Sequence, residues 1–183
     1  GYLVLFSSES DPTVPSGIGV YPMNLALVRM TKSLAVAEST TTNANYDSTF
    51  GGVDFAVTSS SKSVTNKGVK WLTSYSTIST GSAERPRLVQ LSDSSIIVLW
   101  EEWKVVSSMS SYTTTKAMLI DLDGNILKAA TDLGKVHLSR ADDVIPICTT
   151  STTCLEAGWV SGDKTNKTLK LYKLDKNLNL STV

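Results

Sequence analysis

The sequence is poor in the residues on which most enzymes and metal sites depend, with 1 histidine and 2 cysteines among 183 residues. Any histidine-dependent catalytic triad or metal centre would have to be built around His137. No nucleophile motif such as Gly-x-Ser-x-Gly is present. We therefore expect a non-enzymatic chain that needs no cofactor and no metal, with a hydrolase as a distant alternative.

Charge is also scarce, because charged residues make up only 19% of the chain. The 17 basic residues balance the 17 acidic ones, so no net charge attracts a nucleic-acid backbone or an anionic membrane surface. The longest apolar stretches, such as residues 95–100, are far shorter than the roughly 20 residues that span a bilayer. We expect no nucleic-acid partner and no membrane span.

Serine and threonine supply much of the polarity, at about a quarter of the chain, where an average domain relies more on charge. Hydroxyl side chains suit strands and turns and are unfavourable in helix interiors. No stretch shows convincing helical periodicity. The composition predicts an all-β protein, with low-complexity loops at residues 39–45, 59–66 and 107–115.

Two sequence patterns recur along the chain. An apolar run that ends in an aromatic residue occurs at residues 2–9, 96–102 and 155–163, and an alternating strand that leads into a turn occurs at residues 24–34, 117–127 and 169–178. The turn positions Thr31, Asp123 and Asp175 are separated by 92 and 52 residues, which fits a repeat of about 40 to 50 residues with one degenerate copy.

The repeat predicts a single all-β domain over residues 1–183, built from antiparallel four-stranded units of about 45 to 55 residues. The expected units cover residues 1–45, 46–84, 85–134 and 135–183. Because a strand begins at residue 2 with no lead-in, we expect the chain to be a segment of a longer one.

These units resemble β-propeller blades, with a proline-containing first strand, a second strand that ends in Trp and a third that ends in an Asp-Gly-Asn or Asp-x-Asn turn. The resemblance is to the fold, and it implies binding of ligands or partners at the central channel and loop faces. A β-sandwich is the alternative architecture.

Cys148 and Cys154 flank a polar five-residue spacer between two apolar runs, which is typical of a stapled hairpin loop. Their spacing differs from the two-residue spacing of zinc knuckles and thioredoxin-like motifs. We predict a disulfide, with free thiols as the alternative. Glycosylation acceptors at Asn166 and Asn179 agree with a secreted or cell-surface location.

Three groups of polar residues are candidate sites. Glu101 and Glu102 are expected on opposite faces of one strand. Asp121, Asp123 and Asn125 resemble a calcium loop faintly, but a hairpin turn is the favoured interpretation. His137 is expected on the solvent face of an alternating strand.

Trp100 and Trp159 occupy matching repeat positions and are predicted to lie in the core. Trp103 has the opposite strand parity to Trp100 and no counterpart in the other copies. Packing against a neighbouring loop or blade is the favoured interpretation of this residue. The alternative is an exposed tryptophan that stacks on a sugar or anchors a partner chain.

The sequence favours an extracellular structural or adhesive module that assembles with other protein chains, or with the remainder of its own precursor, through blade edges and loops. A carbohydrate-binding propeller, with glycans as ligands, is the alternative.

Overall fold

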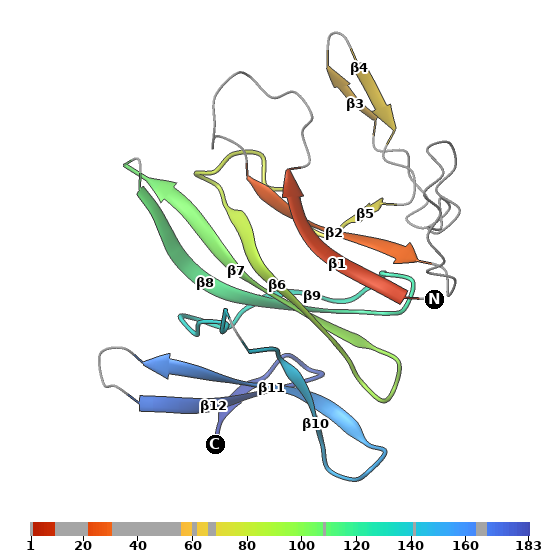
Figure 1. The fold of residues 1–183 in the computed structure, drawn as a ribbon, viewed down its shortest axis with the longest axis vertical. Coiled ribbons are helices and arrows are strands. Elements are labelled where there is room, and N and C mark those ends of the chain that lie inside the picture. The colour runs from red at the N-terminus through yellow and green to blue at the C-terminus, as the bar shows by residue number, and fades with distance from the viewer. Residues whose placement is uncertain are drawn as a thin grey trace. The chain divides into compact units, whose positions relative to one another are not determined.

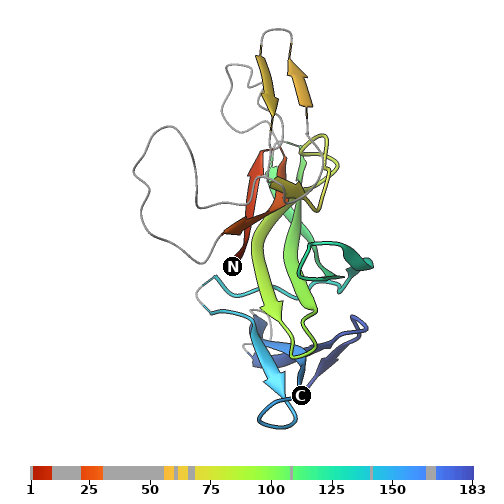
Figure 2. The same ribbon diagram turned by 90° about the vertical axis from the view of Figure 1, so that its right-hand side faces the viewer.

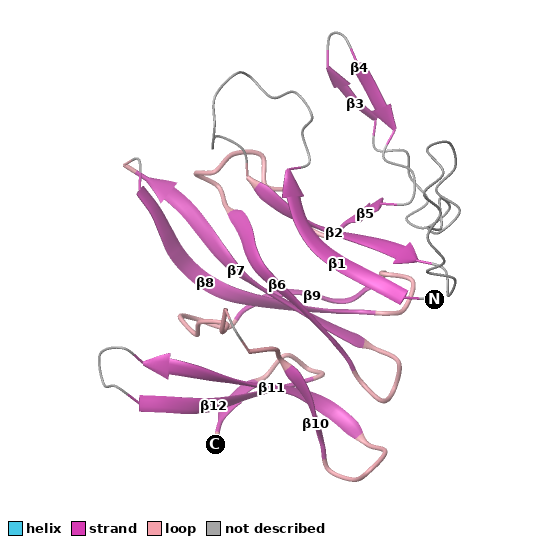
Figure 3. Cartoon of the chain, in the orientation of Figure 1, coloured by secondary structure: helices cyan, strands magenta, loops and turns pink. Residues whose placement is uncertain are grey.

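The computed structural model describes residues 2–9, 22–30, 56–59, 62–65, 69–107, 109–140, 142–163 and 168–183. Every regular element within these ranges is a β-strand (Figure 3), which confirms the predicted all-β class. The same ranges contain no helix that could cross a membrane. The chain divides into an N-terminal unit, Gly1–Ser82, and a C-terminal unit, Ala83–Val183.

The N-terminal unit contains an antiparallel sheet in the order β1-β2-β5 and a separate two-stranded hairpin, β3-β4. The strands are β1 (Tyr2–Glu9), β2 (Met23–Met30), β3 (Ala56–Ser59), β4 (Lys62–Thr65) and β5 (Val69–Trp71). Figure 1 labels these five strands, and Figure 2 shows them after a turn of 90°. Residues 59–66, which were expected to form a loop, therefore include strand β4. Strand β5 joins the sheet of β1 and β2, although it lies in the expected unit 46–84 and they lie in the expected unit 1–45.

Asn24 holds the segment after β5 against β2. Its side chain is fully buried; Nδ2 donates to the Tyr75 carbonyl at 3.0 Å, and Oδ1 accepts from Tyr75 N at 2.6 Å and from the Thr73 hydroxyl at 3.0 Å. A buried amide is tolerated only when its polar atoms are bonded, so this residue specifies how the segment docks.

The C-terminal unit contains two four-stranded antiparallel sheets, in the orders β6-β7-β8-β9 and β10-β11-β12-β13. The first sheet comprises β6 (Ser82–Gln90), β7 (Ile96–Val106), β8 (Met109–Ile120) and β9 (Ile126–Asp132), and the second β10 (Ile145–Cys148), β11 (Cys154–Asp163), β12 (Thr168–Asp175) and β13 (Leu180–Thr182). Both are meanders in chain order, and both are open sheets with two edges.

The last hairpin turns of the two sheets are built alike. After β8, Asp121 accepts hydrogen bonds from the backbone and side-chain amides of Asn125 at 2.8 and 2.9 Å. After β12, Asp175 accepts the same pair from Asn179 at 2.8 and 3.0 Å. The equivalent residues are therefore Asp121 and Asp175, and the sequence alignment on Asp123 was wrong by two residues. Because both Asp121 oxygens are used within the turn, the hairpin interpretation holds over the calcium loop.

A shared hydrophobic core joins the two sheets of this unit. Ile97 and Leu99 of β7 pack in one buried cluster with Ala157 and Trp159 of β11 and with Leu174 of β12. Burial of apolar surface contributes about 25 cal/mol for each Å², so this cluster stabilises the contact between the sheets.

Trp100 and Trp159 are both buried, with 1% and 3% exposure, which confirms the core prediction for each. The prediction that these two tryptophans occupy equivalent positions in the two sheets is wrong. Trp159 pairs with Tyr172 three residues before the turn aspartate, and the residue in that position of the first sheet is Val98, opposite Met118. The two tryptophans therefore fill different positions.

Strands β7 and β8 are longer than the sequence predicted. They continue to Val106 and resume at Met109, so most of the expected loop at 107–115 is strand, with a register shift after Glu102. Conversely, the alternating strand expected around His137 does not form, and among the described residues after β9 the next strand is β10, which begins at Ile145. Both corrections bear on the candidate site.

Candidate functional site

An open cleft of about 1150 Å³ lies within the C-terminal unit. Its lining comes from β6, β7 and β8, from β11 and β12, and from the segment between β9 and β10. We call residues 133–140 of that segment the connecting segment. A cleft of this size suits a ligand of a few rings.

Buried Glu101 organises one side of the cleft. Its side chain has no exposed surface, and Oε1 accepts from Arg85 Nη1 at 2.9 Å and from Leu138 N at 2.9 Å. His137 Nδ1 lies 3.1 Å from the same oxygen, and Trp103 Nε1 donates to Oε2 at 2.9 Å. An ionised carboxylate only accepts hydrogen bonds, so this contact is a hydrogen bond in the forms of His137 that carry a proton on Nδ1. Three of these four donors belong to side chains that line the cleft.

The connecting segment is held in place by strand β8. The Thr115 backbone N–H donates to Gly134 O at 3.0 Å and Leu133 N donates to Thr115 O at 2.8 Å. The hydroxyl groups of Thr114 and Thr115 donate to the carbonyls of Gly134 and Val136. Side chains thus satisfy backbone groups that a sheet would otherwise pair. This is why no strand forms around His137.

Two arginines of β6 fix the far end of the same segment. Arg85 Nη1 donates to Leu138 O at 3.3 Å and Arg87 Nη2 donates to Ser139 O at 2.8 Å. The wall of the cleft is therefore formed before any ligand arrives.

Aromatic side chains form a continuous group along this wall. The rings of Tyr112 and His137 stack at 4.0 Å with an interplanar angle of 28°, and the Trp103 ring is 5.8 Å from that of Tyr112. The Arg85 guanidinium lies 5.7 Å from the centre of the Trp103 ring, within range of a cation–π interaction. Burial raises the pKa of the Tyr112 phenol, as does the nearby Glu101 carboxylate, so this hydroxyl remains a hydrogen-bond donor at neutral pH.

The other lining residues are mainly cationic and hydroxylic. The cations are Arg85, Lys135, Arg140 and Lys170, and the serines are Ser110, Ser111, Ser139 and Ser161. Asp142 is the one carboxylate among the described lining residues, and it accepts a hydrogen bond from the Ser139 hydroxyl at 2.9 Å. Tyr172 lines the cleft from β12 and rests on Trp159, with ring centres 5.7 Å apart.

Two of the candidate residues from the sequence analysis, Trp103 and His137, line this cleft. Trp103 is half-buried there. It packs against Tyr112 and also faces the cleft, so its position is compatible both with packing and with binding of a ligand. His137 is about half exposed, with 49% of its side chain accessible, but it lies in the connecting segment and not on the face of a strand. Glu101 and Glu102 do point to opposite faces, since Glu102 contacts Lys104 and Lys116.

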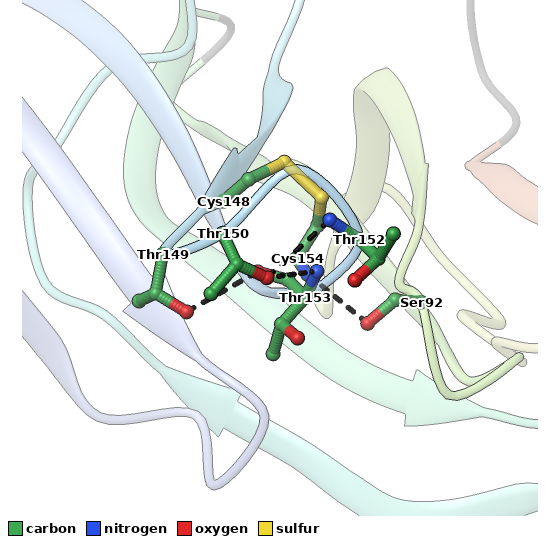
Figure 4. The surroundings of a disulfide bond; sticks show 7 residues. All are labelled: Ser92, Cys148, Thr149, Thr150, Thr152, Thr153 and Cys154. Atoms are coloured by element: carbon green, nitrogen blue, oxygen red, sulfur yellow. Dashed lines mark hydrogen bonds between the residues drawn. A yellow bond between two sulfur atoms is a disulfide. The ribbon is translucent and has the colours of Figure 1, made fainter.

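The predicted disulfide is present between Cys148 and Cys154, across the loop that joins β10 and β11 (Figure 4). Thr150 Oγ1 accepts from Thr153 N at 3.0 Å within this loop. Ser92, in the turn between β6 and β7, bonds to both the amide and the carbonyl of Cys154. The Ser92 hydrogen bonds therefore tie the bridged loop of the second sheet to the first sheet, and neither cysteine is among the lining residues of the cleft.

Of the two glycosylation acceptors, Asn179 is exposed in the turn before β13, and Asn166 lies outside the described residues. No group of three or more residues able to hold a metal ion occurs in the part of the chain that the structure describes.

Comparison with known proteins yields no relative: no protein-family model, curated protein or solved structure matches the chain. The function must be argued from the cleft itself.

Proposed function

We propose that this chain is a non-enzymatic, extracellular carbohydrate-binding module that holds a glycan in the cleft of the C-terminal unit. The observation that carries the proposal is the Glu101 network. One buried carboxylate fixes Arg85, Trp103 and His137, and all three side chains face the cleft. Sugars are bound by aromatic faces together with oriented polar groups, and a rigid arrangement lowers the entropic cost of binding.

The arrangement of acids supports binding over hydrolysis. Glycoside hydrolysis uses two carboxyl groups that flank the scissile bond. Glu101 has no exposed surface, and both of its oxygens accept hydrogen bonds. Among the described lining residues Asp142 alone offers a carboxylate to the cleft. A single exposed carboxylate does not provide the acid and base pair.

We further propose that the two sheets of the C-terminal unit are successive propeller blades. Each is a four-stranded meander in chain order, whereas the sheets of sandwiches are commonly joined by Greek-key crossovers. The disulfide supports an extracellular location, and Asn179 is an exposed glycosylation acceptor that such a location would expose to modification.

The experiment is a glycan array probed with the whole chain, followed by calorimetric titration of each sugar bound. We expect Trp103→Ala to weaken binding by about tenfold or more. Tyr2→Ala, which removes a 53% exposed aromatic side chain in the other unit, is the control and should bind normally. Equal affinity of the Trp103 variant and the wild type, with both folded by circular dichroism, would refute binding in the cleft.

A structural, adhesive role is the second candidate, and strand β9 favours it. All seven of its residues are exposed, including Ile126 at 55% and Leu127 at 56%, and among the strands that the structure describes it pairs with β8 alone. An exposed edge with apolar side chains accepts a β-strand from another chain. Light scattering of natively purified protein tests this: a mass above 19.7 kDa that returns to that value in Ile126→Lys is expected, and a wild-type monomer contradicts it.

A further inference from the structure

The lining of the cleft is more positively charged than the chain as a whole. The whole chain is balanced, with 17 basic and 17 acidic residues, yet four cations and one carboxylate line the cleft. Arg85 is neutralised by Glu101. Among the described residues no carboxylate lies within ion-pair distance of Lys135, Arg140 or Lys170, and all three are exposed.

These three cations come from separate parts of the lining. Lys135 and Arg140 lie near the two ends of the connecting segment, which β6 and β8 hold in place, and Lys170 lies on β12. Like charges gathered around one cavity repel each other and raise the local concentration of anions. An anionic ligand would relieve this repulsion.

The aromatic wall shows what else the ligand must contain. Trp103 and the stacked pair of Tyr112 and His137 present an apolar surface beside the cations. A pyranose ring matches that surface through its C–H face, while Ser110 and Ser111 on β8 offer hydroxyl groups to its polar edge.

We propose that the ligand is an acidic sugar, a pyranose that carries a carboxylate or a sulfate group, with its anion directed to Lys135, Arg140 and Lys170. This rests on the proposed carbohydrate-binding function and names the class of glycan. A single-stranded nucleic acid is disfavoured, because Tyr112 and His137 cover each other at 4.0 Å and leave no succession of free ring faces on which bases stack.

The test is isothermal titration of the whole chain with matched probes. Sialyllactose against lactose isolates the carboxylate, a heparin-derived tetrasaccharide supplies sulfate, and inorganic sulfate and a thymidine oligonucleotide complete the set. We expect at least one of the two acidic sugars, sialyllactose or the heparin tetrasaccharide, to bind at least about tenfold more tightly than lactose. Which of them binds shows whether the cleft prefers a carboxylate or a sulfate group. The preference should shrink as salt rises, because exposed charges are screened.

Charge-removing variants locate the anion. Arg140→Gln and Lys170→Gln should each weaken the binding of the acidic sugar more than the binding of lactose, so that the preference for the acidic sugar falls several-fold. Lys176→Gln, which removes an exposed lysine outside the cleft, is the matched control and should keep the full preference.

The outcomes separate this proposal from the one on which it rests. Equal binding of lactose and of both acidic sugars, lost in Trp103→Ala, overturns the acidic-sugar proposal and leaves carbohydrate binding intact. Inorganic sulfate that binds as tightly as the sugars also overturns it, since the ring contacts would then contribute nothing. Failure of every sugar overturns both proposals, as does an oligonucleotide that outcompetes them in the cleft.

Discussion

The substitution Glu101→Gln tests the network that shapes the cleft, because it removes one charge and keeps the side-chain shape. Oε1 accepts from Arg85 and Leu138, and Oε2 accepts from Trp103. A glutamine amide can replace one oxygen only, so in either orientation its NH2 group meets an N–H donor that then has no acceptor. The guanidinium of Arg85 also loses its carboxylate at 2.9 Å.

The magnitude follows from burial. Loss of one partner of a fully buried pair costs about 3 to 5 kcal/mol, and a hydrogen bond to a charged group is worth about 1.5 to 3 kcal/mol. Arg85 retains 19% exposure and can turn partly to solvent. We therefore expect the free energy of unfolding to fall by about 2 to 3 kcal/mol.

Urea unfolding followed by tryptophan fluorescence measures this loss, with the slope in urea expected to stay constant. The control is Glu156→Gln, since Glu156 contacts Lys173 at a similar 3.1 Å but is 30% exposed. Exposed pairs contribute about 0 to 1 kcal/mol. A loss in the Glu101 variant no larger than in the Glu156 variant would refute the reasoning.

Three further perturbations test other parts of the fold. Cys148→Ser opens a loop of sequence separation 6 and should lower the unfolding free energy by about 2 kcal/mol from loop entropy; the same urea titration should show no further loss when reductant is added. Asn24→Ala leaves buried backbone groups of the docked segment without partners and should cost about 1 to 3 kcal/mol, whereas a loss below that range would mean that the segment docks without it. Hydrogen bonds from Ser95 lower the pKa of Asp93, and in Asp175 burial raises the pKa but the turn hydrogen bonds outweigh it, so the net shift is downward. Because both pKa values are depressed in the folded state, their contribution is present above the ordinary aspartate pKa of about 3.9 and is lost as pH falls further; the urea midpoint should drop on acidification, and less so in the Asp93→Asn, Asp175→Asn double variant.

Local patterns in the sequence were sufficient for the fold class. Alternating apolar residues and hydroxyl-rich polar faces fix strands through nearest-neighbour geometry, so the two meanders and the stapled loop at Cys148 and Cys154 were predictable. The register was harder. Asp121 and Asp123 both precede an asparagine, and only the hydrogen bonds to Asn125 show which of them begins the turn.

Long-range hydrogen bonds explain why the cleft was not predicted. Glu101 and His137 are 36 residues apart, and no periodicity within either segment links them. The alternation around His137 predicts a strand, but the hydroxyls of Thr114 and Thr115 take the backbone acceptors that a strand would use. Those threonines lie in the run that looked like a low-complexity loop, because composition does not distinguish a hydroxyl-rich strand from a linker.

The buried carboxylate is itself an argument for binding. The buried Leu138 N–H gives the fold one reason to keep Glu101 in a strand whose neighbours Leu99 and Trp100 are apolar and buried. Stability is only part of the explanation, because a buried charge that is replaced together with its partners by apolar residues of similar volume often leaves a protein equally stable or more stable. A further reason to keep Glu101 lies in the three side chains that donate to it. Without the carboxylate, Arg85, Trp103 and His137 would be free to adopt several rotamers at the cleft surface. Holding them in one arrangement before a ligand arrives reduces the entropy lost on binding. The stability measured in the Glu101 variant and the sugar affinity of the cleft should therefore fall together.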